Sequence, residues 1–175
     1  MSGFLIIYSS TDGHTKKICE RIKEYFQSAK PAKLVSLNDV ASIDLSSFET
    51  IIIGASIRYG KHSNELYKFI NLNKNILDQK QNAFFSVNVV ARKYEKNTAE
   101  TNPYIKKFLT ISKWKPKKIN VFAGKVDYPK YNFFEKNIIK FIMFVTKGPT
   151  NTSQSYEFTD WLKVEKFAKE LQNNY

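Results

Sequence analysis

Apolar residues along the chain fall into two alternating patterns, short continuous runs and longer segments with helical spacing. Runs of this kind predict strands that are buried on both faces of a sheet. Such runs occupy Phe4–Tyr8 and Thr50–Ala55, and further strands are predicted at Lys33–Leu37, Ala83–Val87 and Ile119–Lys125. Helical spacing occupies Thr15–Ala29, Ser63–Leu72, Ala99–Thr110 and Phe158–Leu171, with a weaker helical pattern over Asn38–Phe48. Because parallel strands need long crossover connections, this alternation predicts an α/β fold with a doubly wound, five-stranded parallel sheet.

One segment, about residues 127–155, is too long for a simple connection between the fifth strand and the last helix. It contains the apolar stretch Phe133–Val145. When this stretch is plotted as a helix, Lys136, Lys140 and Lys147 share one side, while apolar residues fill more than half of the circumference. Two interpretations follow. The stretch is an extra helix packed on the domain, or a helix at a membrane surface or dimer interface with its lysines toward phospholipid headgroups.

No linker, repeat or low-complexity segment divides the sequence, so residues 1–175 are expected to form one domain. The 28 Lys and Arg residues outnumber the 16 Asp and Glu residues, and the net charge of +12 favours nucleic acid, an anionic membrane surface or an anionic small molecule as partner. Nucleic acid is the weakest of these because the lysines are dispersed. The first strand begins too early for a signal peptide, no apolar run reaches the ~18 to 20 residues of a membrane span, and the single Cys19 suits a reducing compartment.

Three polar loops follow the first, third and fourth predicted strands and should converge at one edge of the sheet. The first, within Ile6–Thr15, places hydroxyl groups around a glycine at a helix N-terminus, where free backbone N–H groups and the helix dipole favour phosphate. The loops Gly54–His62 and Ser86–Lys93 are expected to flank a flat ring, so the three together predict a site for flavin mononucleotide (FMN). The candidate cofactor-binding residues are Ser10, Thr11, Asp12, Gly13, His14, Thr15, Ser56, Ile57, Arg58, Tyr59, Gly60, Ser86, Val87, Asn88, Val89, Val90 and Ala91.

The segment I-I-Y-S-S-T-D-G-H-T in the first loop resembles the phosphate loop of flavodoxins. Further motifs resemble the flavodoxin-like, quinone-dependent protoporphyrinogen oxidase family. They are G-A-S-I-R-Y-G-K-H and S-V-N-V-V-A-R-K in the other two loops, T-N-P-Y at 101–104, W-K-P at 114–116, Y-P-K-Y at 128–131, K-F-I-M at 140–143 and T-D-W at 159–161. The resemblance implies the sheet order 2-1-3-4-5, FMN as cofactor, and oxidation of protoporphyrinogen IX to protoporphyrin IX in haem biosynthesis. It also implies a membrane quinone, menaquinone or ubiquinone, as acceptor, and a cytoplasmic enzyme that is peripheral on the inner face of the cell membrane.

The substrate implied by this resemblance carries two propionates, which need cations. Arg58, Arg92 and Lys93 lie in the two loops expected to flank the ring, so they are the candidate substrate-binding residues. A structural ion pair stays equally open for each arginine. His14 and His62 are interpreted as polar loop residues, so no catalytic acid or base is assigned. No Cys, His and carboxylate cluster has the spacing of a metal site.

Two alternative functions remain open at this point. One is an electron-carrier flavodoxin that docks on protein partners, which the charge of +12 disfavours because such carriers are typically acidic. The other is a general FMN-dependent quinone reductase. A homo-oligomer also stays open.

Overall fold

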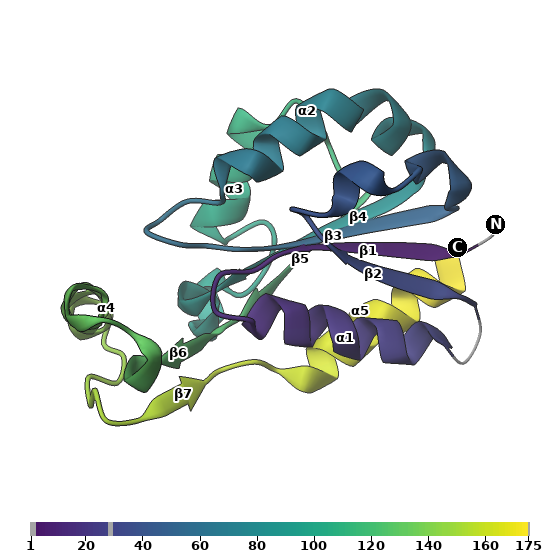
Figure 1. Cartoon of the computed structure of the whole chain (residues 1–175). Helices are drawn as coiled ribbons and strands as arrows, with labels where there is room; N and C mark the ends of the chain where they lie inside the picture. The colour runs from purple at the N-terminus through teal and green to yellow at the C-terminus, as the bar shows by residue number, and fades with distance from the viewer. Residues whose placement is uncertain (1–2, 28–29, 175) are drawn as a thin grey trace.

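Five parallel strands form the centre of the protein in the order β2-β1-β3-β4-β5, which confirms the predicted sheet (Figure 1). In this computed structural model, which describes residues 3–27 and 30–174, the strands are β1 (Phe4–Ser9), β2 (Ala32–Ser36), β3 (Thr50–Ser56), β4 (Gln81–Asn88) and β5 (Lys118–Ala123). Both ends of each predicted strand lie within two residues of the observed ones.

Helices cover both faces of this sheet (Figure 1). They are α1 (His14–Gln27) and α5 (Trp161–Asn174) on one face, and α2 (Asn64–Gln79) and α3 (Pro103–Ile111) on the other. Because successive side chains of a strand point to opposite faces, Ile6 packs in the layer of α1 and α5, whereas Ile7 packs in the layer of α2 and α3. The single Cys19, on α1, is fully buried in its layer.

Capping side chains decide where two of the predicted helices begin. Ser63 is the N-cap of α2, as expected, and its hydroxyl accepts the backbone N–H of Leu66 at 3.2 Å. The next helix begins at Pro103 rather than at Ala99, because Asn102 accepts the N–H of Tyr104 at 3.0 Å and proline suits the first helical position. The predicted helix ends are therefore less accurate than the strands.

The insertion before α5 begins and ends in a two-stranded antiparallel ribbon, β6 (Lys125–Asp127) with β7 (Ser155–Glu157). Between these strands lies α4 (Phe133–Val145), whose N-cap Asn132 and third residue Glu135 form a reciprocal capping box. The ribbon was not predicted, because three residues are too few for a recognisable strand pattern. Figure 1 shows α4 at left, beyond the ends of the strands that carry the three loops.

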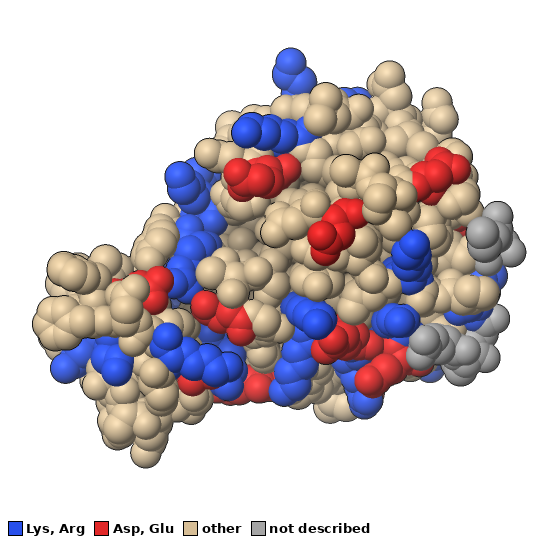
Figure 2. Space-filling model, viewed as in Figure 1, with Lys and Arg blue, Asp and Glu red and all other residues tan. Residues whose placement is uncertain are grey.

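Only one side of α4 packs against the domain. Met143 is 1% exposed in a small core with Val126, Tyr128 and Tyr131, and Ile139 packs against the same core. The other side leaves large apolar side chains in solvent: Phe133, Phe134, Ile138, Phe141, Ile142, Phe144 and Val145. These residues lie in the protruding lobe at the left of Figure 2. Among the helices of the described ranges, none combines the length and apolar character needed to cross a membrane.

Gly54 is the point where β3 has no room for a side chain. It pairs with Tyr8 of β1 and Phe85 of β4, and a Cβ atom built on it would lie 2.6 Å from Cε2 of Phe85. Gly54→Ala should therefore lower the free energy of unfolding by about 1–3 kcal/mol, as overpacking of a dense core does. Urea titration measures this loss.

Gly124→Ala is the matched control, because a Cβ atom there would meet the closest atom, Cγ1 of Val87, at 3.3 Å. It should cost less than Gly54→Ala. Equal midpoints for wild type and Gly54→Ala would show that the Phe85 ring moves aside freely.

Candidate functional site

The first loop leaves an unpaired hydroxyl at the start of α1. The Oγ atom of Ser10 is buried and has no hydrogen-bond partner within the described residues. Gly13 takes a φ of +82°, which turns the chain into the helix, and nothing lies within 4 Å of the position a Cβ atom would take. The first N–H groups of a helix lack partners within that helix. An orphaned hydroxyl beside such a helix start fits a phosphate oxygen.

The second loop is a tight turn at the end of β3. Arg58 and Lys61 exchange backbone hydrogen bonds of 2.9 and 3.2 Å, and Tyr59 and Gly60 between them have positive φ angles of 48° and 76°. Two consecutive positive φ angles are typical of a two-residue hairpin turn. The tip residues Tyr59 and Gly60 are exposed.

The third loop is held from behind by buried polar side chains. Asn88, at the end of β4, accepts the backbone N–H of Ala91 at 3.1 Å and exchanges amide hydrogen bonds with Asn102. Its amide also donates to Ser86 at 3.2 Å, and Ser86 lies 3.0 Å from Nε2 of His62. These groups are all buried, so each one depends on its partner.

The three loops border two cavities that share part of their lining. A cavity of about 60 Å³ at the first loop and one of about 140 Å³ between the other two loops have five lining residues in common. The shared residues are Asp12, Ile57, Asn88, Val89 and Lys125. The smaller cavity contains the Ser10 and Thr11 hydroxyls, whereas the larger one is mostly apolar. A cavity that includes hydroxyl-bearing residues beside a mostly apolar cavity suits the phosphate and the ring of a flavin nucleotide.

Most of the predicted cofactor residues line these cavities, and a few do not. Those that do are Ser10, Thr11, Asp12, His14, Thr15, Ser56, Ile57, Arg58, Tyr59, Gly60, Val87, Asn88, Val89 and Val90. Gly13 lines an adjoining cavity together with Asp12 and His14. Ser86 and Ala91 are buried and line none of these cavities; both are hydrogen-bonded to Asn88. The assignment of this set to FMN stays a prediction.

Several lining residues were not predicted. Gly124 and Lys125 directly follow β5, so the rule that selected the other loops would also have selected this one. The Lys125 side chain lines both cavities and donates to Asp127 at 3.0 Å. The remaining residues come from α3 and the insertion: Tyr104, Val126, Tyr131, Ile139, Ile142 and Met143. Four of them, all but Val126 and Ile139, lie in family motifs of the sequence, but those motifs did not indicate that these residues reach the site.

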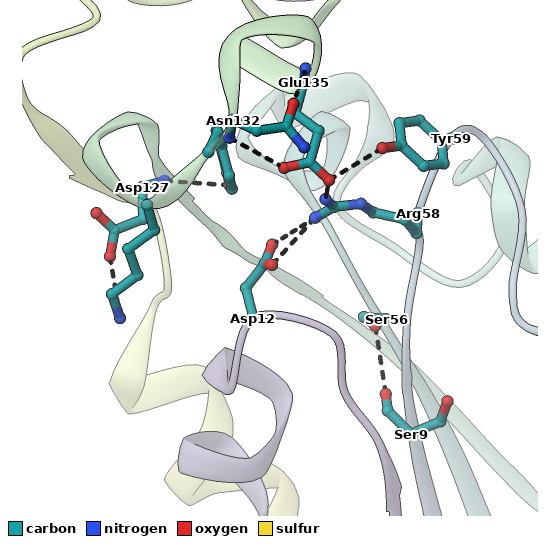
Figure 3. Close-up of polar contacts among 10 residues, drawn as sticks. Ser9, Asp12, Ser56, Arg58, Tyr59, Asp127, Asn132 and Glu135 are labelled. Carbon is teal, nitrogen blue, oxygen red and sulfur yellow. Dashed lines mark hydrogen bonds and ion pairs between the residues drawn. The ribbon is translucent and has the colours of Figure 1, made fainter.

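The two candidate substrate arginines are already bonded within the protein. Arg58 donates to both carboxylate oxygens of Asp12, at 2.9 and 3.0 Å, and to Glu135, which also accepts from the hydroxyl of Tyr59 at 3.1 Å (Figure 3). Arg92 donates to the carbonyl of Val89 at 3.0 Å and to Thr146. Of the three candidate substrate-binding residues, Arg58 alone lines the larger of the two cavities (the ring cavity).

His14 lines the smaller cavity but not the larger one, and its side chain contacts Thr159, two residues before the start of α5. Its Nε2 atom lies 2.6 Å from the hydroxyl of Thr159, which donates to the carbonyl of Ala123 at 2.7 Å. Burial lowers the pKa of His14, so the imidazole is neutral at neutral pH. Through Thr159, His14 at the start of α1 is therefore connected to the end of β5.

Comparison with known proteins relates this chain to a family. The flavodoxin domain family model matches residues 5–153. The chain is 36% identical over 168 residues to the protoporphyrinogen IX dehydrogenase [quinone] of Escherichia coli K12, which covers 95% of this chain and 93% of that protein. The protein of the same name from Leishmania major is 42% identical over 169 residues, covering 95% of this chain and 73% of the relative. The chain belongs to the quinone-dependent protoporphyrinogen IX dehydrogenase family.

This membership confirms the resemblance that the loop motifs indicated. Solved structures support the flavodoxin-like fold of the family member described here. Oxidised flavodoxin 2 from Bacillus cereus superposes with a TM-score of 0.57 over 99% of both chains at 18% identity. A flavodoxin from the domain Archaea superposes with a TM-score of 0.52. At such low identity the likeness extends to the fold alone.

The buried His62, at the end of the second loop, makes the stability of this dehydrogenase family member depend on pH. Burial, followed by the charge of Lys107, lowers the pKa of His62 from 6.5 to about 4. At a pH between these two pKa values, the unfolded chain binds a proton at His62 that the folded chain does not bind. The contribution of neutral His62 to the stability of the fold is therefore complete above pH 6.5 and declines as the pH falls toward 4. Between about pH 7 and pH 5, wild type should lose about 2 kcal/mol more stability than His62→Phe.

Urea titrations at both pH values measure this difference. His14 and the carboxylates are common to both proteins, so their titration cancels. Parallel losses in the two proteins would mean that His62 is protonated in the folded state.

Proposed function

We propose that the chain is an FMN-dependent enzyme that oxidises protoporphyrinogen IX to protoporphyrin IX and passes the electrons to a membrane quinone. The observation that carries this function is the match to the Escherichia coli dehydrogenase, which spans 95% of the chain and so includes the insertion as well as the flavodoxin-like sheet. The positive charge of +12 also argues against an acidic electron-carrier flavodoxin.

The two neighbouring cavities would bind different parts of the cofactor. The hydroxyls of Ser10 and Thr11 and the start of α1 hold the phosphate, while the turn at Tyr59 and the apolar Val89 and Val90 flank the ring. Bound FMN supplies the redox chemistry, taking electrons from the porphyrinogen and delivering them to the quinone. The protein therefore contributes binding, orientation and exclusion of water.

Two buried or half-buried tyrosines of the ring cavity, Tyr104 and Tyr131, carry hydroxyl groups that are candidate hydrogen-bond donors. Burial raises the pKa of Tyr104, so this hydroxyl stays protonated at neutral pH. Burial also raises the pKa of Tyr131, whose hydroxyl accepts the backbone N–H of Asp127 at 3.2 Å. Both side chains line the apolar cavity and can donate a hydrogen bond to a carbonyl oxygen placed there.

We also propose that α4 lies on an anionic membrane surface on the inner face of the cell membrane. Phe133, Phe134, Phe141 and Phe144 on this helix are 67–77% exposed, an arrangement that water disfavours and the boundary between headgroups and acyl chains accommodates. The lysines of the helix region, with Lys147 just beyond its end, supply the attraction to anionic headgroups. Ile142 is both 44% exposed and part of the ring-cavity wall, so a lipid quinone bound at α4 is beside the cavity.

The enzymatic proposal predicts an FMN-loaded protein that forms fluorescent porphyrin from protoporphyrinogen IX faster than autoxidation, with reduction of an added quinone in step. Ser10→Ala should raise the dissociation constant for FMN about ten- to a hundredfold, because a hydrogen bond to a charged group contributes about 1.5–3 kcal/mol. Flavin fluorescence titration measures the constant. Ser42→Ala, at an exposed serine near the strand starts, is the control.

A wild-type protein that retains no FMN contradicts the whole proposal. If the protein retains FMN but shows no porphyrinogen-dependent quinone reduction, the remaining candidate functions are an electron carrier and a general quinone reductase.

The membrane proposal predicts that charge reversal of Lys136, Lys140 and Lys147 to Glu weakens binding to anionic phospholipid vesicles by at least about a hundredfold, since each cation near the surface contributes about 1 kcal/mol. Vesicle sedimentation measures the partition coefficient. The matched control reverses three exposed lysines on α2 and α5, which changes the net charge equally: Lys68, Lys166 and Lys169.

Equal weakening in both triple variants would indicate attraction by net charge alone. Unchanged vesicle binding by the α4 variant, together with a concentration-dependent dimer in analytical ultracentrifugation, would assign the apolar side to a second copy of the chain.

A further inference from the structure

The N-terminal end of α4 is fastened to the first two loops of the site by one arginine. Arg58 lies between the carboxylates of Asp12 and Glu135, and its side chain is 22% exposed (Figure 3). Glu135 is the third residue of α4 and also accepts the backbone N–H of Asn132 at 3.3 Å. An acidic side chain in the first turn of a helix is itself favourable. Arg58 therefore joins the phosphate loop, the second loop and α4 in a single ion-pair network.

The C-terminal end of the same helix is fastened to the third loop by another arginine. Arg92 donates to both the carbonyl and the hydroxyl of Thr146, each at 2.9 Å, and Thr146 is the C-cap of α4. The other guanidinium nitrogen donates to the carbonyl of Val89 at 3.0 Å. A cation at the C-terminal end of a helix interacts favourably with the helix dipole and its unpaired carbonyls.

These two arginines are two of the three in the sequence, and they come from the two loops that border the ring cavity. Between the two attachment points, α4 contributes Ile139, Ile142 and Met143 to the wall of that cavity. A planar guanidinium with several fixed donors suits an attachment that reaches two acceptors at once, which an ammonium group does less well. The helix is thus held across the cavity from one loop to the other.

We propose that Arg58 and Arg92 are positioning residues that hold α4 as the outer wall of the flavin ring cavity, so that FMN binding and the placement of α4 stabilise each other. This inference rests on the proposed binding of FMN. It gives the two arginines a role different from the expected contact with substrate propionates, because their donors are already engaged by Asp12, Glu135, Val89 and Thr146. Coupling between two binding events is reciprocal, so each side of it can be measured.

The test uses Glu135→Gln, which removes the charge that Arg58 binds. Gln also serves in a capping box, so the start of α4 is kept. The matched control is Glu65→Gln, which removes a charge from the first turn of α2, where Glu65 makes no ion pair with any described residue. Amide hydrogen exchange of α4 and flavin fluorescence titration are measured on the full chain, with and without FMN.

In wild type, FMN should slow amide exchange in α4 by at least about tenfold. Glu135→Gln should speed this exchange without FMN, raise the dissociation constant for FMN about three- to tenfold, and reduce the slowing that FMN causes. Glu135→Asp, which keeps the charge, should recover part of both effects, and Glu65→Gln should match wild type. Arg92→Lys should loosen the other end of α4 with the same effect on FMN.

Two outcomes overturn the inference and are distinguishable from each other. If Glu135→Gln and Arg92→Lys speed exchange in α4 but bind FMN as wild type does, α4 does not act as a wall of the cofactor cavity, and the proposed function stands. If wild type itself binds no FMN, the proposed function fails and the inference fails with it.

Discussion

The parallel pairing of β1, β3 and β4 sets the position of the three loops that form the base of the candidate site. Ser9 pairs with Ala55, and Ala55 pairs with Ser86, so the three strands reach the same level of the sheet before their loops begin. A shift of one residue in either pairing would turn the side chains at the strand ends to the opposite face. The close contact between Gly54 and the Phe85 ring supports this register, because only glycine leaves the ring its place.

The insertion adds a second, smaller packing unit to that sheet. Its core is formed by Val126, Tyr128, Tyr131 and Met143, and the hydroxyl of Tyr128 donates to the carbonyl of Pro149 at 2.9 Å. Apolar contacts of this kind have no preferred direction, whereas the arginine attachments at the two ends of α4 are directional. The small core therefore keeps the helix on the domain, and the polar attachments define its orientation.

The sequence was sufficient for the five strands and for the three loops because both follow from periodicity and from the rule that parallel strands end at a common edge, while the order of the strands followed from the family resemblance. It was not sufficient for the partners of the arginines. Arg58 binds Asp12 at a separation of 46 positions and Glu135 at a separation of 77, and Arg92 binds Thr146 at a separation of 54. Nothing in a local pattern selects those acceptors among the other polar residues, because the choice depends on where the insertion folds back.

The burial of the single cysteine has a chemical consequence for the proposed transfer of electrons to a quinone. Quinones are electrophiles that add to thiolates, and the thiolate is the reactive form of cysteine. Cys19 is fully enclosed between α1 and the sheet, and burial, followed by the nearby charge of Glu20, raises the pKa of the thiol. Since the sequence contains one cysteine and it is buried, the folded chain presents no thiol to the proposed quinone acceptor, and arylation of Cys19 would require the helix layer to open first.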